Sequence, residues 1–165
     1  ARVLDNHPRN VPDAVLTRLK QNGGVVMVTF VPGFLSQKVR DYDIRQAGVE
    51  AELKMRFTGN PDGAKAAIAE WIAANPRPTA TISDVADMID HIRKVAGIDH
   101  IGIGGDFGGV AILPDGLENI SKYPDLFTEL ARRGYTKADL AKIAQGNVLR
   151  AMRANEAAAA RQSGG

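Results

Sequence analysis

Two runs of apolar residues predict buried β-strands at residues 25–30 and 98–104. Neither run alternates between apolar and polar side chains, which is typical of strands buried on both faces of a parallel sheet. Pro32-Gly33 ends the first run, and Gly104-Gly105-Asp106-Phe107 ends the second. The pattern therefore predicts two parallel strands, each followed by a loop.

Helical spacing of apolar residues accounts for most of the remaining chain. A helix opens at Asn10-Val11-Pro12-Asp13 and ends at Gly23-Gly24. Thr81 and Asp84 have the spacing of a capping box for a helix that stops at Gly97. Further helices are expected at about residues 36–57, 62–74, 124–133 and 137–145, and from residue 147 onward. The order of helix, strand, helices, strand, helices predicts an α/β fold.

Two strands are too few to form the sheet that this number of helices would cover. The missing strands are therefore expected from another segment or another chain. The sequence begins at Ala1 without a Met, which favours a start inside a longer polypeptide, although a processed N-terminus would begin in the same way. Residues 1–155 are expected to fold, with residues 156–165 as a flexible tail.

Composition argues against several classes of partner. The 21 basic and 19 acidic residues are interspersed and give a formal net charge of +2, so no basic stripe is present to bind nucleic acid. No apolar run reaches the roughly 20 residues that span a bilayer, and no basic amphipathic helix suggests a membrane surface. The absence of cysteine removes thiolate and disulfide chemistry but leaves the localisation undetermined.

Asp106 is the first candidate for chemistry, because reactive groups in parallel α/β folds stand at the carboxyl ends of strands. A carboxylate that is partly desolvated there can transfer a proton. The alternative interpretation is that Asp106 caps the following loop.

Arg9 is the second candidate, because an arginine in a loop before a helix can hold a substrate carboxylate with two hydrogen bonds. The alternative is an ordinary surface arginine. His7 lies beside Arg9 and is a candidate for orienting that loop. His91 and His100 are interpreted as structural or solvated, since no two of the three histidines have the spacing of a metal site. No nucleophile motif and no dinucleotide-binding loop is present.

Short motifs follow one another along the chain in a fixed order. They are His7-Pro8-Arg9-Asn10-Val11-Pro12-Asp13, Asp90-His91-Ile92 with Val95-Ala96-Gly97, Gly104-Gly105-Asp106-Phe107, Gly116-Leu117-Glu118-Asn119, Ser121-Lys122-Tyr123-Pro124-Asp125-Leu126 and Gly146-Asn147-Val148-Leu149-Arg150. In order and spacing these motifs resemble the membrane (renal) dipeptidase family of zinc dipeptidases, in its bacterial type. The match extends over most of the chain.

The resemblance implies the C-terminal part of a (β/α)8 TIM barrel of the metal-dependent amidohydrolase kind. Residues 25–30 would be the seventh strand and residues 98–104 the eighth, with a helical insertion at about residues 39–78 near the barrel mouth. Two zinc ions, bridged by a carboxylate and a water, would be bound by residues upstream of Ala1, so that no metal ligand lies in this chain. The resemblance also suggests a homodimer.

Site residues carry over by the same resemblance. Asp106 would be catalytic and pass a proton to the leaving amine, and Arg9 would hold the terminal carboxylate of a dipeptide. Asn10 and Phe34 would also be substrate-binding, Phe34 replacing a pocket tyrosine of some members. Gly108 departs from a second Asp in the vertebrate-type pattern. The chain is thus expected to be part of a zinc-dependent dipeptidase, completed by an N-terminal barrel segment; the alternative is a non-catalytic fragment or subunit.

Overall fold

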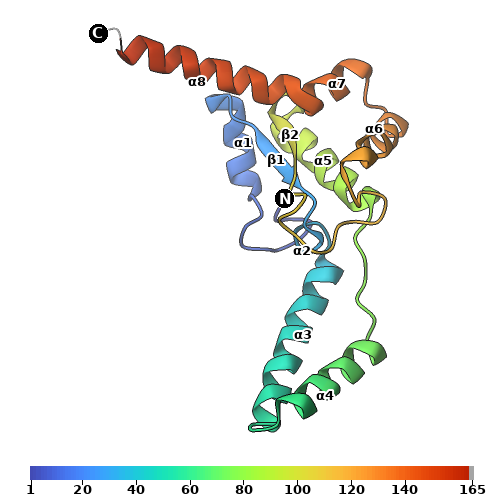
Figure 1. Cartoon of the computed structure of the whole chain (residues 1–165). Helices are drawn as coiled ribbons and strands as arrows, with labels where there is room; N and C mark the ends of the chain where they lie inside the picture. Colours follow the sequence, from blue (N-terminus) through green and yellow to red (C-terminus); the bar gives the residue numbers. More distant parts are fainter. Residues whose placement is uncertain (164–165) are drawn as a thin grey trace.

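The computed structural model describes residues 1–163 as helices arranged around a small sheet (Figure 1). The elements are α1 (Asp13–Asn22), β1 (Val26–Thr29), α2 (Pro32–Leu35), α3 (Gln37–Arg56), α4 (Pro61–Ala74), α5 (Ile82–Ala96), η1 (Ile98–His100), β2 (Ile101–Gly105), η2 (Ile120–Lys122), α6 (Tyr123–Arg132), α7 (Lys137–Ala141), η3 (Lys142–Gly146) and α8 (Asn147–Ser163). The predicted α/β class is confirmed. Within the described residues, no helix combines the length and the apolar character needed to cross a bilayer.

The two strands pair in parallel, as the apolar runs predicted. Val26, Met27 and Val28 face Ile101, Gly102 and Ile103, and Thr29 then faces Gly105, so that β2 carries one additional residue in a bulge. Bulges re-aim the chain at the end of a strand and are common beside active sites. The pairing therefore brings the carboxyl ends of both strands to one edge of the sheet.

The second strand starts later than the sequence predicted. Residues 98–100 form the short helical turn η1 instead of the first part of a strand, so the prediction of a strand at 98–104 is wrong at its beginning. Gly97 adopts a φ of 93°, which turns the chain after α5. The His100 ring then lies with Nδ1 2.7 Å from the carbonyl oxygen of Gly24, next to the start of β1.

Helix ends follow the predicted signals closely. Gly23 has a left-handed φ of 72° and donates its N–H to the Leu19 carbonyl, which closes α1. Thr81 and Asp84 form the predicted capping box of α5. The chain after β1 differs, because Pro32-Gly33 begins the one-turn helix α2 where only the end of a strand was expected.

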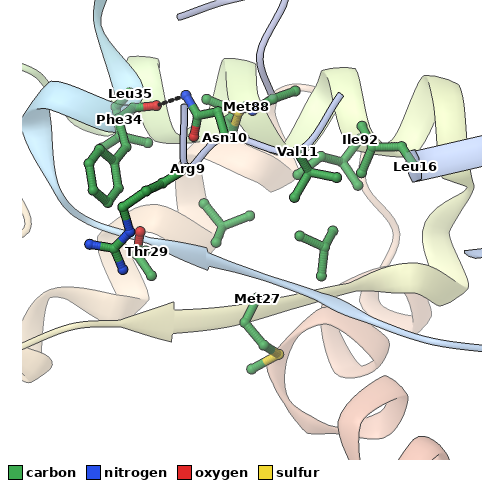
Figure 2. A pocket seen from close by; sticks show the side chains of 13 residues that line it. Arg9, Asn10, Val11, Leu16, Met27, Thr29, Phe34, Leu35, Met88 and Ile92 are labelled. Carbon is green, nitrogen blue, oxygen red and sulfur yellow. Dashed lines mark hydrogen bonds between the residues drawn. The ribbon is translucent and has the colours of Figure 1, made fainter. Parts of the chain in front are cut away.

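The core lies between the sheet and α5. Val28, Phe30 and Ile101 are buried together with Ile89 and Ile92 of α5. Full burial of side chains of this size stabilises a fold by roughly 1.5–3 kcal/mol each. Met27 points away from this core (Figure 2) and is 40% exposed, so the opposite face of the sheet is open in the described residues.

Helices α3 and α4 form a hairpin that projects away from the sheet (Figure 1). Tyr42 of α3 packs on Trp71 of α4 with ring centroids 5.7 Å apart. At the base of the hairpin, Arg77 donates two hydrogen bonds of 2.7 and 2.9 Å to the Asp43 carboxylate. The helical structure predicted for residues 39–78 is therefore observed, while its origin as an insertion stays a prediction.

A buried carboxylate links the N-terminal loop to α3. The Asp5 side chain is fully buried, and Arg40 Nη1 lies 3.7 Å from its Oδ1. Within the described residues, neither Asp5 carboxylate oxygen accepts a hydrogen bond. Burial raises the pKa of Asp5, while the positive charge of Arg40 opposes that rise. Arg40 is thus the charged side chain that compensates a costly buried group.

The C-terminal helices are joined to α5 by an ionic cluster around Arg133. Its guanidinium donates to Asp87, Asp90 and Glu129 at distances between 2.5 and 2.7 Å. Hydrogen bonds from Arg132 and Arg133 lower the pKa of Glu129 to about 2. Tyr135 donates its hydroxyl to Asp90 at 2.7 Å, so α5 and the segment after α6 share one network.

The last helices anchor the amino ends of the strands. Asn147, buried at the start of α8, donates to the carbonyl oxygens of Ile98 and Ile101. Arg150 donates to the carbonyl oxygens of Gly23 and Asp99. Of the tail predicted at residues 156–165, residues 156–163 belong to α8 and residues 164–165 lie outside the described part. Its flexibility stays a prediction.

The lowered pKa of Glu129 predicts a loss of stability in acid. Because the folded pKa is about 2 and the ordinary value is 4.5, the unfolded chain takes up the proton first as the pH falls. The stabilisation is complete above about pH 4.5 and is lost as the pH falls towards 2. Urea unfolding between these pH values should show a weaker pH dependence in Glu129→Gln than in the unchanged protein; parallel curves would contradict the assignment.

The Asp5–Arg40 pair predicts a measurable cost for removing one partner. Arg40→Met leaves the Asp5 carboxylate buried without its counter-charge and should lower the free energy of unfolding by about 3 kcal/mol. Asp5→Leu combined with Arg40→Met removes both charges and should recover most of that loss. Thermal or urea unfolding of both variants measures the difference. A double variant no more stable than Arg40→Met would show that the charge is not the cause.

Candidate active site

The carboxyl ends of β1 and β2 carry the predicted catalytic residue. Phe30, directly after β1, donates its N–H to the Gly105 carbonyl at 2.9 Å, which extends the strand pairing by one residue. Asp106 follows immediately on β2 and is exposed. The structure therefore places Asp106 at the strand end where the sequence predicted it.

Asp106 has an uncommon backbone conformation. Its φ is 75°, and among the described residues it is the one non-glycine residue with a positive φ. Asp tolerates this region better than most residues, because its short side chain can form local hydrogen bonds. The turn is closed by the backbone, with Gly109 N–H donating to the Asp106 carbonyl at 3.1 Å. A methyl group at Gly109 would meet Asp106 Oδ1 at 2.6 Å, so this glycine leaves room for the carboxylate.

Three aromatic rings support the turn at Asp106. Phe30, Phe107 and Tyr123 contact one another edge to face, with ring centroids 5.7 to 5.8 Å apart. Tyr123 begins α6, and its hydroxyl oxygen lies 2.7 Å from the place where a Cβ on Gly105 would stand. Gly105 therefore has to be a glycine for α6 to approach the strand end this closely. Burial raises the pKa of Tyr123, which keeps the phenol protonated at neutral pH.

Arg9 lies in the loop before α1 and is exposed. Its guanidinium carbon is 4.9 Å from the centroid of the Phe34 ring, a cation–π contact that orients the group. The His7 ring lies on the same phenyl ring at 4.3 Å, and His7 Nδ1 accepts the Arg9 N–H at 3.1 Å. Burial, followed by the charge of Arg40, lowers the pKa of His7, in agreement with an unprotonated Nδ1. The predicted role of His7 in orienting this loop is supported by these contacts.

The side chain of Asn10 stabilises the Arg9 loop through hydrogen bonds to the backbone. Its Nδ2 donates to the carbonyl oxygens of Asp5 at 2.9 Å and Phe34 at 2.8 Å. One hydrogen bond stays within the N-terminal segment, and the other joins the loop to α2. This explains why an amide follows Arg9 and leaves a direct contact of Asn10 with substrate as a prediction.

Arg9, Asn10 and Phe34 meet at one cavity of about 140 Å³ (Figure 2). Figure 2 shows the Arg9 guanidinium turned towards Thr29, the last residue of β1, with the Phe34 ring beside it. The rest of the lining is mainly apolar and comes from the N-terminal segment, α1, β1, α2 and α5. The structure therefore brings the three predicted substrate-binding residues together. Asp106 lies outside this cavity, after the neighbouring strand.

The remaining histidines have structural partners, as predicted. His91 Nε2 lies 2.8 Å from Asp13 Oδ1 and joins α5 to α1, while His100 contacts the Gly24 carbonyl. In residues 1–163, no three His, Cys, Asp or Glu side chains gather closely enough to hold a metal ion. The described residues by themselves do not fit a metal centre, and no metal-dependent step can be assigned to them.

Sequence patterns missed two parts of the site. The aromatic support had a signal, since Phe30 ends one predicted strand, Phe107 lies in the loop after the other, and Tyr123 lies in one of the motifs. The Asp5–Arg40 pair had none, because the two residues are far apart in sequence and neither belongs to a recognisable pattern.

Comparison with known proteins identifies the family. A family model described as membrane dipeptidase (peptidase family M19) matches residues 1–164. An uncharacterized dipeptidase of Schizosaccharomyces pombe is 40% identical over 158 residues, which cover 94% of this chain and 29% of that protein. The probable dipeptidase PvdM of Pseudomonas aeruginosa has a similar structure, with a TM-score of 0.69 and 27% identity over 91% of this chain and 42% of that one.

A metallo peptidase of Rhodobacter sphaeroides, solved with a phosphinate mimic of the dipeptide L-Ala-D-Ala, shares the fold. Its TM-score is 0.61 at 21% identity, over 88% of this chain and 31% of that one. The chain thus spans less than half the length of each of these proteins. The match of the family model to almost the whole chain nevertheless decides the family, and this chain belongs to the membrane dipeptidases of peptidase family M19.

Proposed function

We propose that the complete protein is a metal-dependent dipeptidase, and that this chain supplies the groups that bind the substrate carboxylate and transfer a proton. Membership of peptidase family M19 supports the reaction class. The parallel pairing of β1 and β2 is the observation that carries the assignment of residues. It brings Thr29 and Gly105 to the same edge of the sheet. Arg9 lies beside Thr29 (Figure 2), and Asp106 follows Gly105.

Arg9 binds the terminal carboxylate of the dipeptide in this proposal. A guanidinium can donate two parallel hydrogen bonds to one carboxylate, which fixes the orientation of the substrate as well as its position. The Phe34 ring and the hydrogen bonds of Asn10 hold the Arg9 loop before substrate arrives. Such preorganisation lowers the entropic cost of binding. Phe34 contributes its ring face and, unlike a tyrosine, no hydroxyl group.

Asp106 transfers a proton in this proposal. Its carboxylate accepts a proton from the attacking water and donates it to the nitrogen of the leaving amine as the amide bond breaks. General acid–base groups must lie within hydrogen-bonding reach of the proton they move. The exposed position of Asp106 after β2, on a turn closed by Gly109, leaves its carboxylate accessible from the sheet edge.

We infer that the complete protein binds two zinc ions. Their ligands would lie outside this chain, in the N-terminal part of a (β/α)8 barrel whose last two strands are β1 and β2. Metal dependence is implied by the family. The open face and the few strands of the sheet support the completion of the barrel by further strands. A homodimer of the complete protein is also proposed, from the resemblance alone.

A second candidate function is that of a non-catalytic subunit or fragment. The lack of a three-residue metal-ligating group in residues 1–163 favours this role for the chain when it is alone. The isolated chain would then bind no zinc tightly and hydrolyse no dipeptide. Native mass spectrometry of the chain with and without its upstream part separates the two candidates, because it reports the chain complement and the bound metal together.

Asp106→Asn in the complete protein should lower kcat by about 100-fold or more, because the amide cannot carry the proton. Asn also tolerates a positive φ, so the turn should keep its conformation. Steady-state hydrolysis of dipeptides measures the effect, and an unchanged melting temperature serves as the control for folding. Unchanged kcat would remove Asp106 from the mechanism.

Arg9→Met should raise KM for dipeptides by roughly 10- to 100-fold, as expected for the loss of a charge-assisted hydrogen bond. The defect should disappear when the substrate is a dipeptide amide, which has no terminal carboxylate for Arg9 to bind. Arg18→Met, an exposed arginine of α1, is the matched control and should leave KM unchanged. An equal loss for dipeptides and their amides would show that Arg9 acts in another way.

A further inference from the structure

A second, larger hollow lies beside the Arg9 loop. It has a volume of about 550 Å³, within the range of small-molecule sites, roughly 300–1,000 Å³. Its walls come from the loop around His7, from α2, from the base of α3 and from the segment at residues 110–112. The loop around His7, the stretch from α2 to α3 and residues 110–112 are separate in the sequence, and the hollow forms where they meet.

The hollow and the proposed substrate site share a lining residue. Phe34 lines both it and the cavity that contains Arg9. The phenyl ring carries the Arg9 guanidinium at 4.9 Å and the His7 ring at 4.3 Å, and His7 also lines the hollow. On another side, residues 110–112 follow directly on the turn that Asp106 and Gly109 close. The hollow is therefore bounded by segments adjoining both proposed functional residues.

The charged side chains in the wall are compensated within the protein. Asp43 accepts two hydrogen bonds from Arg77, and Arg40 faces the buried Asp5 carboxylate at 3.7 Å. The pKa of His7 is lowered, which favours the neutral ring. A charged ligand group would have to compete with these pairs for a partner. The charges thus favour a neutral ligand over an acidic or a basic one.

The rest of the wall is apolar, and part of it is exposed. Ile44 of α3 is 59% exposed and Ile112 is 50% exposed, and Ala47 lies one turn after Asp43 on the same helix. When an apolar group covers large apolar side chains that are in contact with water, the free energy of the system falls. Their position around one hollow points to a neutral, apolar ligand group.

We propose that this hollow binds the side chain of the C-terminal residue of the dipeptide and selects for large apolar side chains. The inference rests on the proposed function, because Arg9 must hold the carboxylate of that same residue. With the carboxylate at Arg9, the side chain on the adjacent α-carbon passes Phe34 and enters the hollow. Ile44 and Ala47 of α3 are then specificity-determining residues, although they lie outside the sheet.

The test fills the hollow in the complete, metal-loaded protein. Ala47→Trp places a large ring among the lining residues, whereas Ala51→Trp makes the same change one turn further along α3, outside the hollow. Values of kcat/KM are measured for Gly-Leu, Gly-Phe, Gly-Asp, Gly-Lys, Gly-Gly and Leu-Gly. The unchanged protein is expected to prefer Gly-Leu and Gly-Phe to Gly-Asp and Gly-Lys.

Ala47→Trp should lower kcat/KM for Gly-Leu and Gly-Phe by about tenfold or more, as is common for lost apolar contacts in a pocket. Gly-Gly and Leu-Gly, whose C-terminal residues have no side chain, should keep their rates, and these rates also show that the variant is folded. Ala51→Trp should leave all the rates unchanged.

Other results overturn the inference. Equal losses for Gly-Leu and Leu-Gly would mean that the ring obstructs entry or that another segment occupies the hollow. No change for Gly-Leu and Gly-Phe would mean that the side chain lies elsewhere, while the dipeptidase assignment stands. If the unchanged, metal-loaded protein hydrolyses none of the dipeptides, the proposed function itself fails and the inference fails with it.

Discussion

The parallel pairing of β1 and β2 is the constraint on which the rest of the structure depends. Because the strands run in the same direction, the residues that follow them, Phe30 and Asp106, must emerge at the same edge. The helical segments between the strands have to return the chain across the molecule before β2 can begin. The long connection this requires includes both the core helix α5 and the hairpin of α3 and α4. The aromatic contacts beyond the strands then fix the geometry that the pairing creates.

The two ends of the sheet are stabilised by different means. At the amino ends, Asn147 and Arg150 bind backbone carbonyls, so that α8 secures the beginning of β2 and the turn before β1. At the carboxyl ends, the side chain of Asn10 and the backbone turn at Asp106 supply hydrogen bonds within the loops, and the packing of the aromatic rings adds to them. Function is commonly located in loops held by a rigid scaffold. The loops at the carboxyl ends, which carry Arg9 and Asp106, agree with that arrangement.

Much of this arrangement could be predicted from local patterns. Apolar runs identified both strands, and the signals at Gly23 and Thr81 identified helix ends, because each depends on neighbouring residues only. Residues 98–100 were assigned wrongly, since an apolar residue after a glycine suits a strand and a 3-10 turn equally well. Arg9 and Asp106 were candidates because of their places before a helix and after a strand, and the resemblance between motifs assigned their roles. Asp5 with Arg40, and the wall of the larger hollow, depend on contacts between distant segments, which periodicity does not report.

The hairpin of α3 and α4 can change in sequence without changing the sheet. Its base contributes Ile44, Ala47 and the Asp43–Arg77 contact to the rim of the hollow, while its far end at Thr58, Gly59 and Asn60 is exposed. Mutations that lengthen α3 or change its tilt would reshape that rim without disturbing the hydrogen bonds between β1 and β2. The proposed substrate preference and the integrity of the sheet would thus be encoded in separate stretches of sequence. Natural variation can therefore explore the first while selection maintains the second.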